Sequence, residues 1–233
     1  MGASLRLGRV FGIPIEINIS WVLVFLFLTY LLAGQFDDAR LRWPVAQRWT
    51  VAMITVVLFF LSVLAHELSH SVMALSKGIP VRGITLFIFG GVSRLEREPQ
   101  RPLTEFMVAV VGPLLSIALA VIFGAVWFLL GRGDSPVEVV LLLLAWTNLS
   151  LGVFNLVPGY PLDGGRLLRA AIWGITGNHR KATRIAAGMG QAVGIAMVVG
   201  GVTLAVFMEP VDGVWLGIVG IFLFSMARSS FPK

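Results

Sequence analysis

The sequence predicts an all-α polytopic membrane protein with six transmembrane helices and a small β-sheet or hairpin at the membrane surface. Composition is the first reason. Of the 233 residues, 57% are hydrophobic and only 13% are charged, which is far too apolar for a soluble domain of this length. The second reason is that the apolar residues form long runs, and the third is that two other stretches show β-type patterns.

Six apolar runs are candidates for transmembrane helices, and polar stretches separate most of them. They cover about residues 20–33, 51–76, 106–130, 137–157, 185–208 and 211–226. The first run is short for a crossing, although a thin or protein-surrounded position would accommodate it. No repeat, low-complexity tract or composition shift divides the chain, so we expect a single transmembrane domain over residues 1–233.

Two stretches favour strands. Isoleucines alternate with other residues from Ile13 to Ile19, the period-two pattern of a strand with one apolar face. The segment from Ile79 to Leu95 is rich in β-branched and aromatic residues, with Gly90 and Gly91 at the expected turn, and favours a hairpin. Both stretches are too short to span a bilayer as strands of an isolated sheet, so we expect them at the membrane surface.

The positive charges predict the orientation. Most of the Lys and Arg residues near span ends fall on the side of both termini, whereas the opposite side receives only Arg40, Arg42, Arg48 and Arg132. The positive-inside rule then places both termini in the cytoplasm. The basic stretch from Arg169 to Arg184 is expected to face solvent there. No basic domain interleaved with aromatic residues is present, so the net charge of +6 does not indicate nucleic-acid binding.

A metal-binding pattern lies inside the second span. His66, Glu67 and His70 form an HExxH motif, and the i, i+4 spacing places both imidazoles on one helix face with the glutamate beside them. Such a motif binds zinc and uses the glutamate as the base that deprotonates an attacking water. Titratable groups within a span are costly unless they face a cavity, a partner or a metal, so helix–helix hydrogen bonding alone is a weaker explanation for the cluster.

The composition narrows the choice of the third metal ligand but does not decide it. The chain has no cysteine and three histidines, so this ligand is either His179 or a carboxylate. His179 stands among polar and basic residues, which favours a solvated loop. Asp163 stands in apolar and glycine-rich sequence and would lie on the same side of the membrane as the HExxH motif. The alternative for Asp163 is a helix N-cap. Asn148, midway along the fourth span, is expected to form interhelical hydrogen bonds, and the alternative for it is a substrate contact.

Together, the HExxH motif and the segment from Asn155 to Gly165 resemble the two signature motifs of the site-2 protease family of intramembrane zinc metalloproteases. The resemblance extends over nearly the whole chain and is greatest to the six-span branch, whose members often carry CBS domains. It implies that His66, His70 and Asp163 ligate Zn²⁺ and that Glu67 is the general base. It also implies that Asn155 contacts substrate or the oxyanion and that the hairpin lies near the active site. Gly90 and Gly91 of this hairpin are expected to bind substrate, and the alternative for the hairpin is a structural plug at the membrane surface. No CBS-like region follows the last span in this sequence, so we expect either a piece of a longer protein or a member without that C-terminal regulatory domain.

The predicted function is therefore hydrolysis of a peptide bond within or near the membrane segment of a single-span substrate, such as a membrane-anchored signalling or anti-sigma factor. The expected setting is the cell membrane of a prokaryote. The lipid bilayer is the other expected partner, nucleic acid is not expected, and a homodimer remains open. Two other functions stay open: a divalent-metal transporter that uses the His and Glu site, and an inactive scaffold.

Overall fold

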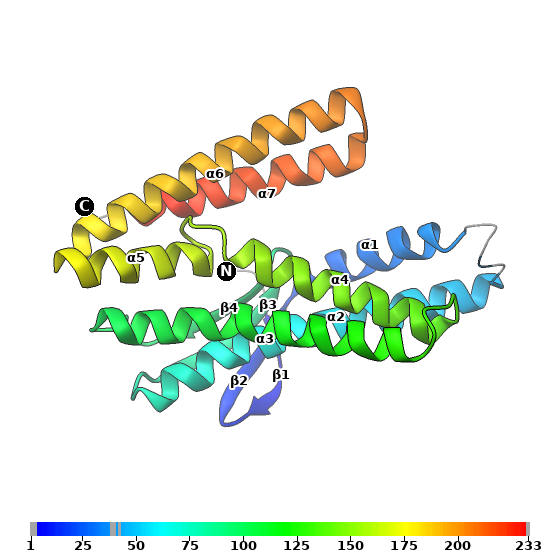
Figure 1. The fold of residues 1–233 in the computed structure, drawn as a ribbon, viewed down its shortest axis with the longest axis horizontal. Coiled ribbons are helices and arrows are strands. Elements are labelled where there is room, and N and C mark those ends of the chain that lie inside the picture. The colour runs from blue at the N-terminus through cyan, green and yellow to red at the C-terminus, as the bar shows by residue number, and fades with distance from the viewer. Residues whose placement is uncertain (1–3, 38–40, 42, 232–233) are drawn as a thin grey trace. The chain divides into compact units, whose positions relative to one another are not determined.

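The computed structural model describes residues 4–37, 41 and 43–231. Arg40 and Arg42, two of the charges used to predict the orientation, lie outside the described residues. The elements follow one another in this order along the chain (Figure 1): β1 (Ser4–Val10), β2 (Ile13–Asn18), α1 (Ile19–Gln35), α2 (Val45–Ser76), β3 (Val81–Phe87), β4 (Gly90–Leu95), α3 (Pro102–Leu129), α4 (Pro136–Asn155), α5 (Asp163–Thr176), α6 (His179–Phe207) and α7 (Pro210–Ser229).

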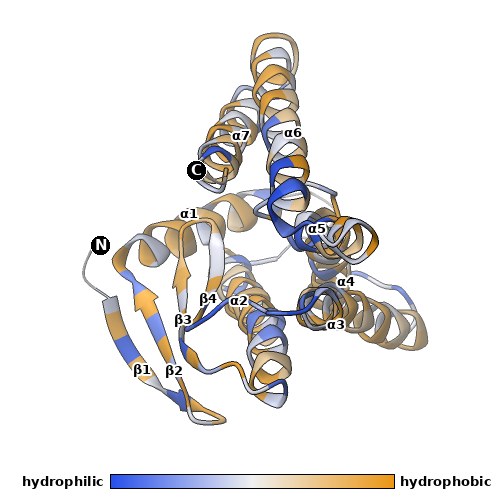
Figure 2. Ribbon diagram, turned by 90° about the vertical axis from the view of Figure 1, so that its left-hand side faces the viewer, coloured by the Kyte–Doolittle hydropathy of each residue, from blue (hydrophilic) through white to orange (hydrophobic). Residues whose placement is uncertain are grey.

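Five helices, α2, α3, α4, α6 and α7, are long and apolar enough to cross a membrane. The remaining expected span is α1, whose 17 residues extend about 25 Å, somewhat less than the roughly 30 Å of a bilayer core. The predicted fold class, a helical membrane protein with a small sheet, is confirmed. Of the six predicted spans, five correspond to helices that are long and apolar enough to cross a membrane. Colouring by hydropathy shows apolar residues along these helices and polar ones gathered at α5 and the beginning of α6 (Figure 2).

The chain forms two compact units. The first contains residues Met1–Glu98 and Leu114–Gly152, and the second contains Pro99–Pro113 and Val153–Lys233. Helices α3 and α4 therefore contribute to both units. The single domain over residues 1–233 stays a prediction.

The first unit contains a four-stranded sheet in the order β1-β2-β3-β4, so β4 is an edge strand. Strands β2 and β3 pair in parallel, and the outer pairs are antiparallel. The buried residues Ile13, Ile15 and Ile84 pack against Leu64 and Leu68 of α2. The strand predicted from the isoleucine alternation is confirmed as β2, and its apolar face is the one that α2 covers.

The hairpin is confirmed, but its predicted turn is wrong. Residues Phe87 and Gly90 are paired, so the turn consists of residues 88 and 89, and Gly90 and Gly91 are the first residues of β4. A glycine suits position 91 within the strand because the side chain of Glu67 occupies the space where a Cβ atom would be. Strand β1 was not expected, and all of its residues are exposed, which explains why no burial pattern predicts it.

In the second unit, α6 and α7 pack as a hairpin through glycines. A Cβ atom on Gly194 would lie 2.8 Å from the backbone nitrogen of Phe224, so the two backbones approach closely there. Helix α5 precedes them and ends at Thr176, and its C-cap residue Gly177 adopts a left-handed conformation. The prediction that Arg169 faces solvent is wrong, because its side chain is 5% exposed and pairs with Glu105 of α3.

Candidate metal centre

The two histidines lie one turn apart on α2, as their spacing predicts. Their ring centroids are 4.9 Å apart with an angle of 78° between the planes, and both residues are buried. Leu64 and Leu68 occupy the helix face that covers the sheet. The 3.6-residue period therefore gives α2 one face for the sheet and another for the histidines.

Hydroxyl groups contact α2 near the HExxH motif from two directions. Nδ1 of His66 lies 2.9 Å from Oγ of Ser116 on α3. Ser71 donates a hydrogen bond to the backbone oxygen of Glu67 at 2.9 Å, and its Oγ lies 2.8 Å from Oγ of Ser93 on β4. These contacts tie α2 to α3 and to the edge strand at the level of the HExxH motif.

Glu67 is partly buried and lies against the beginning of β4. A Cβ atom on Gly91 would lie 2.5 Å from Cγ of Glu67, closer than such atoms can approach. The absence of a side chain at Gly91 therefore leaves space for the side chain of Glu67. Gly90, the neighbouring residue, adopts φ = 125°, a conformation that other residues rarely adopt.

Asp163 is the first residue of α5 and is buried. The N-cap position belongs to Leu162, so the side chain of Asp163 does not take the N-cap role that was the alternative for it. A Cβ atom on Gly164 would lie 2.2 Å from the backbone oxygen of Leu156, and one on Gly165 would lie 2.2 Å from the nitrogen of Tyr160. The two glycines therefore let α5 press directly against the loop that leads into it.

A buried ion pair also holds helix α5. Arg169 of α5 donates a hydrogen bond from Nε to Oε1 of Glu105 at 2.6 Å, and Glu105 is fully buried. The guanidinium also lies 5.4 Å from the ring centroid of Tyr160, in the loop before Asp163. Sequence reasoning missed Glu105. The signal that could have found it is a single acid four residues past Arg101, at the start of an apolar helix, with an arginine available in the basic segment.

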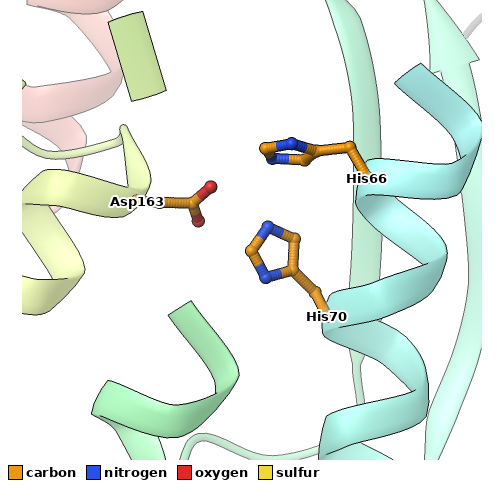
Figure 3. Close-up of side chains that lie close together, drawn as sticks. All are labelled: His66, His70 and Asp163. Atoms are coloured by element: carbon orange, nitrogen blue, oxygen red, sulfur yellow. The ribbon is translucent and has the colours of Figure 1, made fainter. Parts of the chain in front are cut away.

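His66, His70 and Asp163 form a potential metal-binding group. Each offers one ligand atom, and these atoms lie within 4.8 Å of one another (Figure 3). The rings and the carboxylate point toward one another. Two imidazoles and one carboxylate suit zinc, and a buried carboxylate beside two histidines is more stable with a cation than without one. The residues present therefore fit the metal that the sequence predicts.

The remaining residues singled out in the sequence have the following positions. Asn155 is the last residue of α4 and is half-buried, and His179 begins α6 with its ring packed against Trp173. Asn148 donates to Oγ of Ser62 on α2 at 3.2 Å, which confirms the expected interhelical hydrogen bond. Its Oδ1 is buried with no hydrogen-bond partner among the described residues.

A separate charged cluster lies within the sheet. Arg94 donates to Oε2 of Glu16 at 2.6 Å, and Arg6 donates to Oε1 at 3.4 Å. Burial of Glu16 alone would raise its pKa, but the charges and hydrogen bonds of Arg94 and Arg6 outweigh this and hold the pKa below its usual value of 4.5. Glu16 is thus a negatively charged cross-strand link between β1, β2 and β4.

These observations define a class: a helical membrane protein with a buried His, His, Asp group and a glutamate in the same helical turn. The family model of peptidase family M50 matches residues 54–137 and 132–200. The chain belongs to this family.

Known relatives agree with this assignment. The chain is 40% identical to a candidate zinc metalloprotease of Synechocystis, over 99% of this chain and 60% of the relative. It is 36% identical to Rip3 of Mycobacterium tuberculosis, named in the same way, over 98% of this chain and 58% of the relative. The solved structure of the site-2 protease from Methanocaldococcus jannaschii is 30% identical with a TM-score of 0.67, covering 99% of this chain and 96% of that chain. The chain spans about 60% of the length of the first two relatives.

Proposed function

We propose that this chain is the catalytic membrane part of an intramembrane zinc metalloprotease. The observation that carries the proposal is the buried group of His66, His70 and Asp163 on helices of a membrane protein, with Glu67 in the same turn of α2 as the histidines. Membership of peptidase family M50 supports the same activity. In this proposal the two histidines and Asp163 are the protein ligands of Zn²⁺.

The remaining roles fall to the residues around this group. A bound zinc ion would acidify water and polarise the scissile carbonyl. Glu67 accepts the proton of the attacking water and passes it to the leaving amine. Asn155 donates a hydrogen bond to the oxyanion that develops on the substrate. Gly91 keeps space for the Glu67 side chain during these transfers.

The substrate in this proposal is a single-span membrane protein that binds as an added strand along β4. A transmembrane helix hides its carbonyls in hydrogen bonds, so it must become extended before it can be cut. Strand β4 is at the edge of the sheet, and its residue Gly91 contacts Glu67. Backbone pairing along β4 would hold the extended segment next to the base. Both termini of the enzyme would face the cytoplasm, and His66, about 15 Å from the end of α2, would lie in the cytoplasmic half.

The test is cleavage of a purified single-span substrate by the purified chain in detergent or vesicles. The proposal predicts peptide hydrolysis that a zinc chelator abolishes and added zinc restores. Glu67→Gln removes the base but leaves the three ligands, so it should bind zinc and cut at least about 1,000-fold more slowly. Metal movement across vesicles without hydrolysis would support the transporter instead, and an active Glu67→Gln protein would refute the role of the base.

Strand pairing needs its own experiment. Synthetic substrates carry a single N-methyl group at successive backbone positions around the cleaved bond, which removes one hydrogen-bond donor at a time. Pairing along one edge predicts that cleavage falls at every second position, because alternate N–H groups of a strand point to the same side. Equal sensitivity at all positions, or at none, would contradict binding along β4.

A further inference from the structure

The hydroxyl of Ser116 is used differently from several other hydroxyls inside the helices of the first unit. Thr55 and Ser62 of α2 and Thr147 of α4 donate to backbone oxygens of their own helices four residues earlier. This is the ordinary way for a hydroxyl to be satisfied in an apolar helix. Ser116, which is fully buried, instead contacts Nδ1 of His66 across two helices at 2.9 Å. Among the described residues this is its one hydrogen-bond contact.

The chemistry of imidazole gives this contact a direction. A neutral histidine carries a proton on one ring nitrogen and a lone pair on the other. If the Ser116 hydroxyl donated to Nδ1, the proton would sit on Nε2 and that nitrogen could not bind a metal. If Ser116 accepts the Nδ1 proton, Nε2 has the lone pair, and the ring is held in one orientation.

We propose that Ser116 is a positioning residue whose Oγ accepts the Nδ1 proton of His66 and presents Nε2 of that ring to the metal. This inference rests on the proposed zinc site. It assigns α3 a part in the metal centre, although α3 contributes no ligand. Ser116 belongs to the same compact unit as His66, so the contact is internal to that unit.

Zinc affinity of the purified chain in detergent, measured by competition with a chromophoric chelator, tests the proposal. Loss of a hydrogen-bond partner behind a ligating histidine weakens metal binding about 10- to 100-fold. Ser116→Ala should show a loss of this size, and Ser116→Thr, which keeps a hydroxyl, should bind zinc within a few-fold of the wild type. A Ser116→Ala protein with wild-type affinity would overturn the proposal.

Ser62→Ala is the matched control. Ser62 is also buried in the first unit and lies one turn before His66 on α2, but its hydroxyl bonds to Leu58 and Asn148 and, among the described residues, to neither histidine. This variant should keep the zinc affinity of the wild type. If Ser62→Ala lost as much affinity as Ser116→Ala, the effect would come from general loosening of the helices, and the specific role of Ser116 would be wrong.

A second measurement does not depend on any variant folding. Nitrogen-15 NMR of the zinc-loaded wild type, with labelled histidine, distinguishes a protonated Nδ1 from a metal-bound one. The proposal predicts a protonated Nδ1 and a metal-bound Nε2 for His66, and the reverse would overturn it. A wild-type chain that binds no zinc would refute the proposed function itself, whereas zinc binding with unchanged Ser116→Ala affinity would refute only this inference.

Discussion

The two units of the molecule hold their metal-binding residues by different kinds of contact. In the first unit, the regular spacing of α2 places His66 and His70, and a side-chain contact from Ser116 orients one ring. In the second unit, Asp163 begins a helix whose backbone presses against the preceding loop at Gly164 and Gly165 and whose middle is held by the pair of Arg169 and Glu105.

This difference teaches which substitutions should affect metal binding alone. Around the histidines, the helix keeps its shape when a neighbouring hydroxyl is removed, so the loss is local. Around Asp163, the supporting contacts are made by backbone atoms and buried charges, so their loss moves the helix and lowers the free energy of unfolding. Substitutions in the two units should therefore separate a local loss of metal binding from a loss of stability.

The largest effect on stability is expected at the buried ion pair. Glu105→Gln leaves the guanidinium of Arg169 buried without its negative partner, which should cost about 3–5 kcal/mol of unfolding free energy. Replacement of both residues, as Glu105→Leu with Arg169→Met, should recover most of this loss, because no unpaired charge remains. Denaturation of the purified proteins in detergent measures both.

An exposed pair provides the comparison for that measurement. Arg82 and Glu96 lie 3.8 Å apart with side chains 69% and 49% exposed. Glu96→Gln should change stability by less than about 1 kcal/mol, since water screens such pairs. Equal losses for Glu96→Gln and Glu105→Gln would contradict the special importance of the buried pair.

The next effect is expected where α5 meets its loop. Gly164→Ala would place a Cβ atom 2.2 Å from the oxygen of Leu156, and relief of this collision should cost about 1–3 kcal/mol. Because the backbone that carries Asp163 must shift, zinc affinity should fall as well. Thermal denaturation and zinc competition measure the two losses. The control is Gly188→Ala in α6, where a Cβ atom meets nothing within 4 Å and neither property should suffer.

On the histidine side, Gly91→Ala tests activity more than stability. The new Cβ atom would collide with Cγ of Glu67, a flexible side chain that can move away. Displacement of the base by about 1 Å should lower kcat about 100-fold with zinc binding unchanged. Kinetics of substrate cleavage together with metal analysis check this. A loss of zinc in Gly91→Ala would show that β4 supports the ligands as well as the base.

The smallest expected effect is the pH dependence of stability that comes from Glu16 in the sheet. The pKa of Glu16 is lowered in the folded protein, so its contribution to stability is present above the unfolded pKa near 4.5 and is lost as pH falls through the lower folded value. Glu16→Gln should therefore lose stability at neutral pH and show a weaker decrease on acidification below pH 4.5. Thermal denaturation across that range measures the difference, and identical pH profiles would contradict the role of the charge.

Periodicity predicted the parts of the fold in which one face of an element is apolar. The isoleucine alternation identified β2, and the i, i+4 histidines identified their shared face on α2. Strand β1 was not predicted because it is exposed along its whole length and has no face of apolar residues that alternates with a polar face. The turn of the hairpin was misplaced because Gly90 and Gly91 resemble a turn, whereas Gly91 is required by contact with Glu67, a residue far away in the sequence.

The candidate site was predicted where it depends on local spacing and missed where it depends on contacts between distant segments. His66, Glu67 and His70 lie within five positions, and glycines and prolines mark Asp163 as unusual. Nothing near Ser116 indicates that its hydroxyl contacts His66, and nothing near Arg169 distinguishes it from the other arginines of the basic segment. Both contacts become visible only when the packing of the helices is known.

Zinc content and affinity of the wild type and of Asp163→Asn test the central claim most directly. A carboxylate that completes the metal site predicts one tightly bound zinc per wild-type chain and loss of that zinc in Asp163→Asn, with the helical content unchanged. An Asp163→Asn protein that retains zinc with wild-type affinity would contradict the joint site of His66, His70 and Asp163.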